Sequence, residues 1–379
     1  MTLIQTLVLG LVQAVAALIL IFILVPLTVF AERKVLGYLQ VRLGATRVAG
    51  GNIGFTSFMN RKMWALGRVP VLSYWRGIPM LVADILKLFL KEDIRPAKSD
   101  KFVFLFAPAL SMVASMVVFT AISFYPGTWF VMPKWIPIIG GLAFRGVMSD
   151  MNVSLLFILG IASVGVYGIV LGGWASNSKY PLLGGMRSAA QMVSYEVPLT
   201  LSLIVPVVLT GSLNFNALTL DLATKMPLYS VPSMVVAFFV YLTAGYAECN
   251  RLPFDMAEAE NELVAGFHTE YSGIRFGLFY LAEYINMVVV CALAAAFFLG
   301  GPYLLPFGFH RFIQHVPYLG APSLLVYVVK IIFLLFCFIW VRGTIPRYRY
   351  DQIQQVAWKF LLPITLVNLF VAAAVRFLM

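Results

Sequence analysis

Charged side chains are scarce in this sequence. Asp, Glu, Lys and Arg together make up 11% of its 379 residues, whereas a soluble globular domain carries about 25%. Hydrophobic residues reach 61%, and the mean hydropathy is +0.91. A water-facing surface cannot accommodate so many apolar side chains. The composition therefore excludes a soluble globular protein and predicts one whose main solvent is lipid.

Cysteine and histidine are also rare, with three copies of each. The cysteines form no CxxC pair, whereas a structural zinc site or an iron–sulfur cluster needs four suitable ligands at recognisable spacing. We therefore expect no bound metal and interpret the cysteines as small apolar packing residues. The six residues concerned are Cys249, Cys291, Cys337, His268, His310 and His315.

The pattern at the N-terminus does not indicate a cleavable signal peptide. The sequence starts with an apolar stretch, residues 3–30, which is longer than the ~7–15 residues of a signal-peptide core and lacks a basic segment before it. Glu32, Arg33 and Lys34 follow directly. We therefore predict that this stretch is retained as the first membrane helix.

Long apolar runs dominate the rest of the sequence. A run of about 20 residues spans the hydrocarbon core of a bilayer as a helix. We find eight such runs, with no repeat of fixed period and no low-complexity linker. The sequence therefore predicts an all-α membrane protein, one polytopic domain over residues 1–379 with about eight transmembrane helices. The runs cover residues 3–30, 102–124, 151–172, 190–212, 231–247, 275–300, 322–341 and 359–378.

The basic residues predict how these helices are oriented. Twenty-one of the 27 Lys and Arg residues fall in four connecting segments that share one side of the membrane if the spans alternate. Such an excess marks cytoplasmic loops, so both termini face the other side. Topology thus explains the net charge of +11, and because no nucleic-acid-binding motif accompanies it we expect no nucleic-acid partner. The segments are residues 31–101, 173–189, 248–275 and 342–359.

The first of these segments contains a predicted cytoplasmic amphipathic helix, Ile78–Phe89. Leu81, Ile85, Leu88 and Phe89 recur there at helical spacing, with charged residues set among them. Such a helix lies at the membrane surface or packs against a soluble partner, and the sequence favours neither.

Acidic residues gather in one of the loops. Six of the sixteen fall within twenty-three residues, offset only by Arg251 and Arg275. Asp255 and Glu258 fit a helix N-cap and its capping-box partner, which explains those two in structural terms. For the rest we favour a proton-exchanging site, because clustered carboxylates at low dielectric share protons instead of all ionising. The six are Glu248, Asp255, Glu258, Glu260, Glu262 and Glu270.

Two further acids, Glu196 and Glu283, fall inside predicted spans. A carboxylate at membrane depth is costly and indicates function by default. Pro198 follows Glu196 closely, and because proline removes a backbone hydrogen bond, a kink there admits water beside the acid. The alternative is that Glu196 lies near a wet membrane face. Lys330 is also within a span, where a long side chain can snorkel to the interface.

Several segments carry a family resemblance. The stretch Ala247–Gly273 resembles the signature of the H subunit of bacterial NADH:quinone oxidoreductase, known in mitochondria as NADH dehydrogenase subunit one. The resemblance covers almost the whole chain. The other matching segments are Ala31–Lys34, Gln40–Arg42, Ala83–Lys87, Lys91–Asp93, Leu183–Pro198, Pro346–Gln352 and Trp358–Pro363.

The sequence departs from the family pattern in four places. Gly44–Thr46 reads Gly-Ala-Thr where the family usually has Gly-Pro-Asn, and roughly 25 extra residues lie between Gly51 and Gly77. Both changes fall in the loop expected near the quinone entrance, so they bear on its shape and on the choice of quinone. Ala257 replaces a usual Pro and Gly343 a usual Trp. The carboxylates are unaffected.

The resemblance implies a function. Such a chain is a membrane subunit of proton-translocating complex I in the bacterial inner membrane, where it forms part of the quinone chamber and couples quinone reduction to proton movement. A neighbouring subunit supplies the electrons, so the chain has no NADH or iron–sulfur site of its own. The substrate is ubiquinone or menaquinone. The implied partners are the peripheral-arm quinone-site and terminal iron–sulfur subunits, adjacent small membrane subunits, and lipid.

The resemblance and the acid pattern together give two groups of candidate site residues. The proton-linked carboxylates are Glu196, Glu248, Glu258, Glu260, Glu262 and Glu283. The quinone-binding candidates are Glu32, Arg33, Lys34, Arg42, Arg251 and Asp255. Alternatively Asp255 is a helix cap, and the basic residues of this group dock the peripheral arm or only fix the topology.

Three other functions compete with this interpretation. A homologous subunit of a membrane-bound hydrogenase keeps the fold and the acids but uses no quinone, so quinone-dependent activity discriminates the two. A secondary transporter often has inverted internal repeats, which are absent here. A non-catalytic anchor for the peripheral arm has no reason to keep a costly acid such as Glu196 inside a span.

Overall fold

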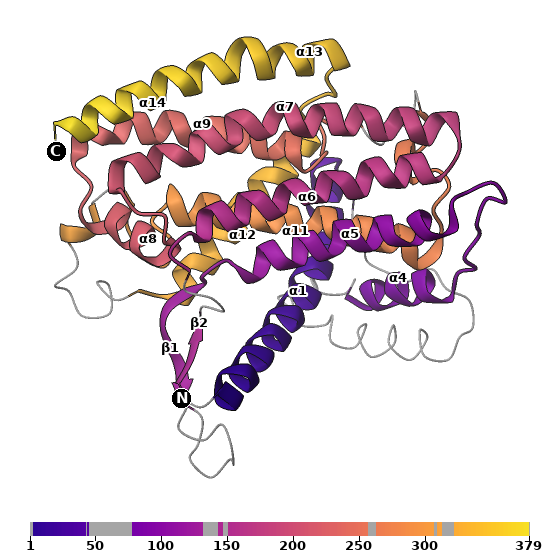
Figure 1. Cartoon of the computed structure of the whole chain (residues 1–379), viewed down its shortest axis with the longest axis horizontal. Coiled ribbons are helices and arrows are strands. Elements are labelled where there is room, and N and C mark those ends of the chain that lie inside the picture. The colour runs from indigo at the N-terminus through magenta and orange to yellow at the C-terminus, as the bar shows by residue number, and fades with distance from the viewer. Residues whose placement is uncertain are drawn as a thin grey trace.

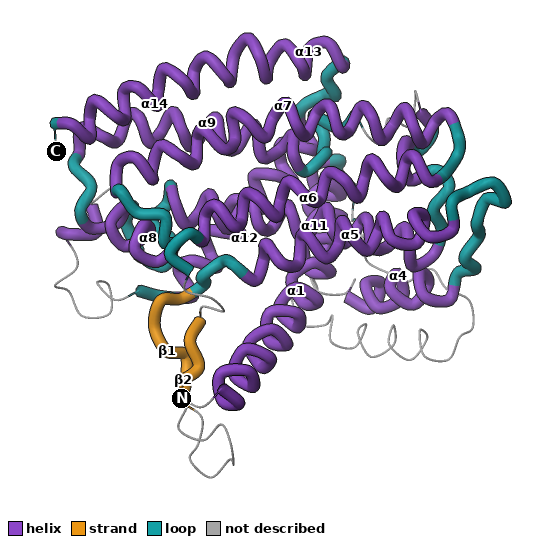
Figure 2. Tube along the Cα trace, viewed as in Figure 1, coloured by secondary structure: helices purple, strands orange, loops and turns teal. Residues whose placement is uncertain are grey.

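The structure, a computed structural model, describes residues 3–42, 44, 78–131, 143–146, 151–256, 263–306, 309–312 and 322–378. Figure 1 shows a bundle of long helices that lie along the longest axis, with α1 (Leu3–Leu39) inclined to the rest. Most of the described loops lie toward the two ends of the bundle (Figure 2). The chain termini lie toward the same end (Figure 1).

Eight of the described helical segments are long and apolar enough to cross a membrane. They coincide with the eight predicted runs, so the prediction of an all-α, multi-pass membrane protein is confirmed. The last segment joins α13 to α14 through a π-helical turn, Val356–Leu361. The segments are α1, α5 (Lys101–Thr120), α6 (Ser154–Ala175), α7 (Lys179–Thr210), α9 (Val231–Glu248), α11 (Gly273–Phe297), α12 (Leu324–Thr344) and α13–α14 (Tyr350–Gln355 and Leu362–Phe377).

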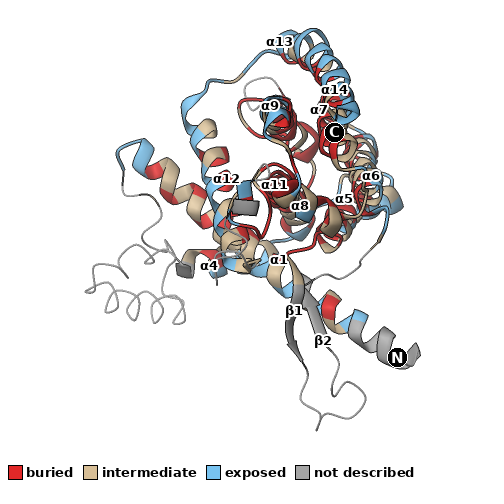
Figure 3. Ribbon diagram, turned by 90° about the vertical axis from the view of Figure 1, so that its left-hand side faces the viewer, coloured by how far each residue is buried: buried red, intermediate tan, exposed pale blue. Residues whose placement is uncertain are grey.

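Helix α11 forms the centre of the bundle. Every residue from Met287 to Phe297 is buried, and the other long helices surround it (Figure 3). A helix that is apolar on all sides fits such a position, because it has no polar face that needs water. By contrast, α1 and α14 lie at the edges and expose broad apolar faces, which fits helices in contact with lipid or with other membrane helices.

The four basic segments meet at one end of the bundle, which we call the loop end. Hydrogen bonds join them in pairs, namely Asp100 with Ala175, Ile94 with Ser272, and Tyr348 with Pro253. At the opposite end the remaining connections contact one another, namely Ser123 with Asn216, Leu155 with Leu213, and Ser323 with Pro302. The helices therefore alternate in direction as the distribution of basic residues requires.

The start of α7 differs from the prediction. Helix α7 begins at Lys179 rather than at residue 190, so only the turn 176–178 remains of the predicted loop 173–189. At 1.5 Å per residue, its 32 residues extend about 48 Å, whereas the hydrocarbon core is ~30 Å thick. Its first turns therefore project beyond the core, where Lys179 and Arg187 are tolerated in a helix.

Two small elements were not predicted, and both belong to the end opposite the loop end. Strands β1 (Tyr125–Val131) and β2 (Ala143–Gly146) pair as an antiparallel hairpin. Helix α8 (Phe215–Thr224) starts at Asn214, whose side chain accepts hydrogen bonds from two backbone N–H groups of the first turn. Both elements are too short to give a clear periodic signal.

The predicted amphipathic helix is present as α4, Ile78–Leu90. Leu81 is buried, and Leu88 packs against α11. Ile85 and Phe89, which share their helical spacing, are exposed instead. Helix α4 thus keeps an apolar face free, as both a membrane-surface helix and a partner-bound helix require.

Candidate functional site

A buried ion pair lies in the loop-end half of the bundle. Glu283 projects from α11, and its Oε2 lies 3.5 Å from Nη2 of Arg251, which follows α9. His268, in the short 3-10 helix Gly266–His268, places Nε2 3.5 Å from Oε1 of the same carboxylate. All three residues are buried. Because charges interact strongly away from water, this carboxylate responds to any new charge placed near it.

Two tyrosines of α11 surround the guanidinium of Arg251. Its Cζ lies 4.2 Å from the ring centroid of Tyr284 and 5.5 Å from that of Tyr280. The two hydroxyl oxygens are 3.0 Å apart and share a hydrogen bond. The aromatic faces therefore favour the cation, while the hydroxyls form a polar path along one face of α11.

This path reaches α1 through Glu32. The hydroxyl of Tyr284 donates to Oε2 of Glu32 at 2.6 Å, and Arg342 on α12 forms an ion pair with the other carboxylate oxygen. Helix α1 thus meets α11 and α12, from the other end of the sequence, at one buried acid. We call the whole set the Glu32–Glu283 network; its members are Glu32, Arg251, His268, Tyr280, Glu283, Tyr284 and Arg342.

A glutamine on α7 fixes the loop that carries Arg251. Gln191 is fully buried, and its Nε2 donates to the backbone carbonyl of Ala247 at 2.7 Å and to that of Phe254 at 2.6 Å. Between them, Asn250 adopts φ +49°, in the left-handed region that asparagine tolerates better than most residues. The loop is therefore held at both ends by one side chain.

A second pair of carboxylates lies on α7 and α9. Glu196 accepts a hydrogen bond from the hydroxyl of Ser163 on α6, and Glu248 is the last residue of α9. The helices α7 and α9 pack against each other, so these two acids belong to neighbouring helices of the bundle.

Two predicted quinone-binding residues lie around Glu32 on α1. Arg33 pairs with Asp84 of α4 at 2.5 Å, and both side chains are about 40% exposed. Lys34 is buried, with its ammonium 5.9 Å from the ring centroid of Phe30. These two basic residues therefore help to fix α1 and α4 rather than stand free in solvent.

The remaining predicted residues are placed differently. Arg42 is exposed in the turn after α1. Asp255 is half-buried in the loop that carries Arg251. Glu258, Glu260 and Glu262 fall in residues 257–262, outside the described part of the chain.

Comparison with known proteins decides the family. The family model named NADH dehydrogenase matches residues 12–373. The chain belongs to the NADH dehydrogenase family. One of the NADH-quinone oxidoreductase H subunits of Geobacter sulfurreducens is 41% identical over 96% of this chain and 95% of its own length. The H subunit of Rhodospirillum centenum is 40% identical over 96% and 92%, and that of Rickettsia typhi 38% over 96% and 93%.

In this member of the NADH dehydrogenase family, the sequence did not reveal four members of the Glu32–Glu283 network as site residues. Tyr280 and Tyr284 flank Glu283 at helical spacing, a signal that has many structural explanations. His268 was of interest in the sequence only as a metal ligand. In the sequence, Arg342 was counted only among the basic residues that fix the topology. Its ion pair with Glu32 joins two distant segments, and no local sequence pattern indicates such a pair.

One departure from the family pattern lies beside this network. A Cβ atom on Gly343 would lie 2.8 Å from Cδ1 of Leu39 and 3.0 Å from Cδ2 of Leu36. The usual tryptophan does not fit at this separation of α1 and α12. Glycine therefore permits the close approach of the helices that places Arg342 on Glu32.

Proposed function

We propose that this chain is the quinone-site membrane subunit of a proton-translocating NADH:quinone oxidoreductase in the bacterial inner membrane. The Glu32–Glu283 network carries the proposal, because it sets buried titratable groups where the basic loops meet. The full-length similarity to the H subunits of three bacteria supports it. The chain contributes to an oxidoreductase without an NADH or iron–sulfur site of its own.

Quinone reduction consumes two electrons and two protons and passes through negatively charged states. Partner subunits of the peripheral arm deliver the electrons. A negative charge that develops beside the loop end attracts the Arg251 guanidinium and weakens its hold on Glu283 (3.5 Å apart). The carboxylate then favours its protonated form. Quinone reduction and proton uptake are coupled in this way.

The residues divide into three roles. Glu32, Arg251 and Asp255, with Arg33, Lys34 and Arg42 around them, face the quinone headgroup or the arm that closes over it. Glu283 converts the change of charge into a change of protonation. Glu196 and Glu248, on the packed helices α7 and α9, pass the proton into the membrane part, with Glu258, Glu260 and Glu262 on the same path.

Two surfaces of this chain indicate which partners it binds. The loop end binds the peripheral-arm subunits that hold the quinone site and the terminal iron–sulfur cluster. The exposed apolar faces of α1 and α14 contact lipid and adjacent small membrane subunits. The quinone, ubiquinone or menaquinone, enters along the apolar helices that guide its isoprenoid tail.

The experiment that tests the proposal is Glu283→Gln in the assembled complex. NADH oxidation with ferricyanide, which bypasses the quinone, stays normal. Quinone reduction and proton pumping fall by roughly 10²-fold, as is typical when a proton-transfer group is removed. The matched control is Asp221→Asn, which removes an acid paired with Lys225 at the opposite end and leaves all activities unchanged.

A complex that assembles on a native gel and pumps normally with Glu283→Gln contradicts the proposed role of the network. The same assay applied to Glu258→Gln tests the acidic loop. Loss of pumping there assigns Glu258 to the proton path, whereas full activity assigns it to a helix cap or a surface charge. If both variants reduce the amount of assembled complex but the assembled complex keeps its full activity, the chain is a structural anchor for the peripheral arm instead.

A further inference from the structure

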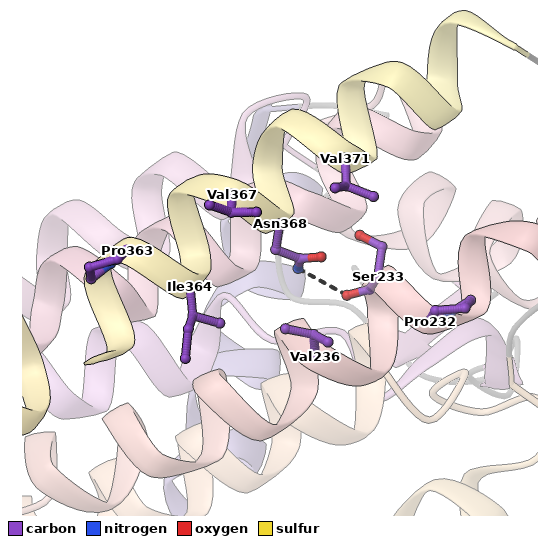
Figure 4. A pocket seen from close by; sticks show the side chains of 8 residues that line it. All are labelled: Pro232, Ser233, Val236, Pro363, Ile364, Val367, Asn368 and Val371. Carbon is purple, nitrogen blue, oxygen red and sulfur yellow. Dashed lines mark hydrogen bonds between the residues drawn. The ribbon is translucent and has the colours of Figure 1, made fainter. Parts of the chain in front are cut away.

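An apolar groove runs between α9 and α14 in the membrane-spanning part of the bundle. Figure 4 shows side chains of both helices along its two sides, with Asn368 between them. The groove has a volume of about 450 Å³ and almost wholly apolar walls. Its lining residues are Pro232, Ser233, Val236, Pro363, Ile364, Val367, Asn368 and Val371.

The size of the groove limits what fits inside it. The groove holds only part of any membrane component that lies along it, whether a helix or a lipid, so the choice between the two rests on charge. A volume of about 450 Å³ lies within the range of small-molecule sites, ~300–1,000 Å³, and the groove opens toward the lipid.

One end of the groove is polar because α9 starts there. Ser233 lies in the first turn of α9 with 4% of its surface exposed, and its hydroxyl has no hydrogen-bond partner among the described residues. Asn368 donates instead to the backbone carbonyl of Ser233 at 3.0 Å (Figure 4). The first turn contains no acidic residue and receives no side-chain cap. Pro232 has no N–H group, and the N–H of Val231 donates to the carbonyl of Leu228. The helix dipole and the Ser233 hydroxyl therefore favour an anion at this position.

The surroundings of this polar end are basic. Arg376 lies five residues beyond Val371 on α14 and donates to the carbonyl of Leu209 at 3.0 Å. Lys225 follows α8, and its side chain is 74% exposed. Among the described residues of the end opposite the loop end, Asp221 is the single acid, and it pairs with Lys225. The electrostatics therefore favour a negatively charged ligand.

We propose that this groove binds one anionic phospholipid, with an acyl chain along α14 and the phosphate at the first turn of α9. The apolar walls hold the acyl chain of this phospholipid, so that bulk lipid displaces it less easily. The Ser233 hydroxyl and the nearby cations recognise the headgroup. The site lies apart from the Glu32–Glu283 network and serves a binding function of its own.

The test is to count the phospholipids retained by the purified complex that contains this chain, by native mass spectrometry and lipid extraction. Val367→Trp fills the groove, and we expect the loss of one retained phospholipid per complex. Phe370→Trp is the matched control, because Phe370 is exposed on α14 outside the groove lining, and it retains that lipid. If Val367→Trp prevents assembly, Ile364→Phe makes the same test with a smaller increase in volume.

The headgroup is tested by exchange against an equal mixture of phosphatidylglycerol and phosphatidylcholine. The unmodified complex retains phosphatidylglycerol in at least about threefold excess at this site, and Ser233→Ala brings the ratio toward one. An unchanged lipid count in both groove-filling variants overturns the proposal. So does the loss of a small membrane subunit in place of lipid, because the occupant is then a protein helix. If the unmodified complex retains both lipids equally, the groove has no preference for an anionic headgroup, and the proposal of an anionic phospholipid site is overturned.

Discussion

The ammonium of Lys330 on α12 lies 3.1 Å from the carbonyl oxygen of Gly301, just beyond the end of α11. It also donates to the carbonyls of Leu299 and Tyr303. An ammonium has three donors, so all of them are used. All three acceptors lie in the turn that follows α11, which ends at Phe297. Lys330 therefore fixes this turn from a neighbouring helix.

Replacing Lys330 by Met should destabilise the subunit by on the order of 2–4 kcal/mol, because the buried carbonyls lose their donor. The free energy of unfolding in mixed detergent micelles measures the change. Lys330→Arg keeps the charge and serves as the control, with a smaller loss. Equal stability of the Met variant and the unmodified chain would show that water or lipid satisfies these carbonyls instead.

The ion pair between Glu32 and Arg342 should behave as a coupled unit. Removing one partner of a largely buried pair leaves an uncompensated charge, whereas removing both does not. A double-mutant cycle with Glu32→Gln and Arg342→Met should therefore give a coupling of on the order of 1–3 kcal/mol in unfolding free energy. Strict additivity of the two single losses would mean that the pair is not formed in the membrane.

Gly184 on α7 should not tolerate a side chain. A Cβ atom there would lie 2.7 Å from both the Cα of Gly266 and the backbone nitrogen of Phe267. These are backbone atoms and do not yield easily, so Gly184→Ala should cost about 1–3 kcal/mol. Gly160 on α6 has no atom within 4 Å of its Cβ position, so Gly160→Ala should be neutral or stabilising by ~0.5–1 kcal/mol. Thermal inactivation of the two variants compares them directly.

Cys249 should resist alkylation at neutral pH. Burial raises the pKa of this thiol well above its usual range, and the charge of Glu248 raises it further. The raised pKa keeps the thiol protonated through neutral and mildly alkaline pH, and the thiolate is the reactive form. N-ethylmaleimide should therefore label Cys249 far more slowly in native membranes than in SDS. Rapid labelling of the folded chain at neutral pH would contradict the buried placement.

Gly343→Trp restores the usual residue of the family and should force α1 away from α12. The overpacking should cost about 1–3 kcal/mol and weaken the neighbouring ion pair of Arg342. Gly343→Ala meets only the ends of the Leu39 and Leu36 side chains, so it should be tolerated. Quinone reduction and thermal stability of the two variants give the measurement. A stable and fully active Trp variant would mean that α1 has room to move.

The membrane helices were predictable because each one is encoded by a continuous apolar run. The sequence missed the β-hairpin of Tyr125–Val131 and Ala143–Gly146, since a run that contains proline and glycine resembles a turn. It placed the start of α7 too late, because Lys179 and Arg187 ended the apolar run although the helix continues past them. Both errors concern segments at the edge of the hydrocarbon core.

The candidate site was predictable only in pieces. Glu32, Arg251 and Glu283 were each selected from a different segment, and their roles stay predictions. The sequence contained no sign that Tyr284 joins them, because its bond to Glu32 spans 252 residues. Periodicity reports contacts within a helix, whereas this network depends on how α1, α11 and α12 approach one another.

The complete burial of α11 from Met287 to Phe297 also has a consequence for mutational tolerance. A helix with every face in contact with its own chain has no surface left for another subunit and no position where a larger residue fits. Selection should therefore remove substitutions along this stretch, whereas substitutions should accumulate on the outer faces of α1, α12 and α14. The surfaces that contact neighbouring subunits should therefore diverge more among relatives than the central helix does.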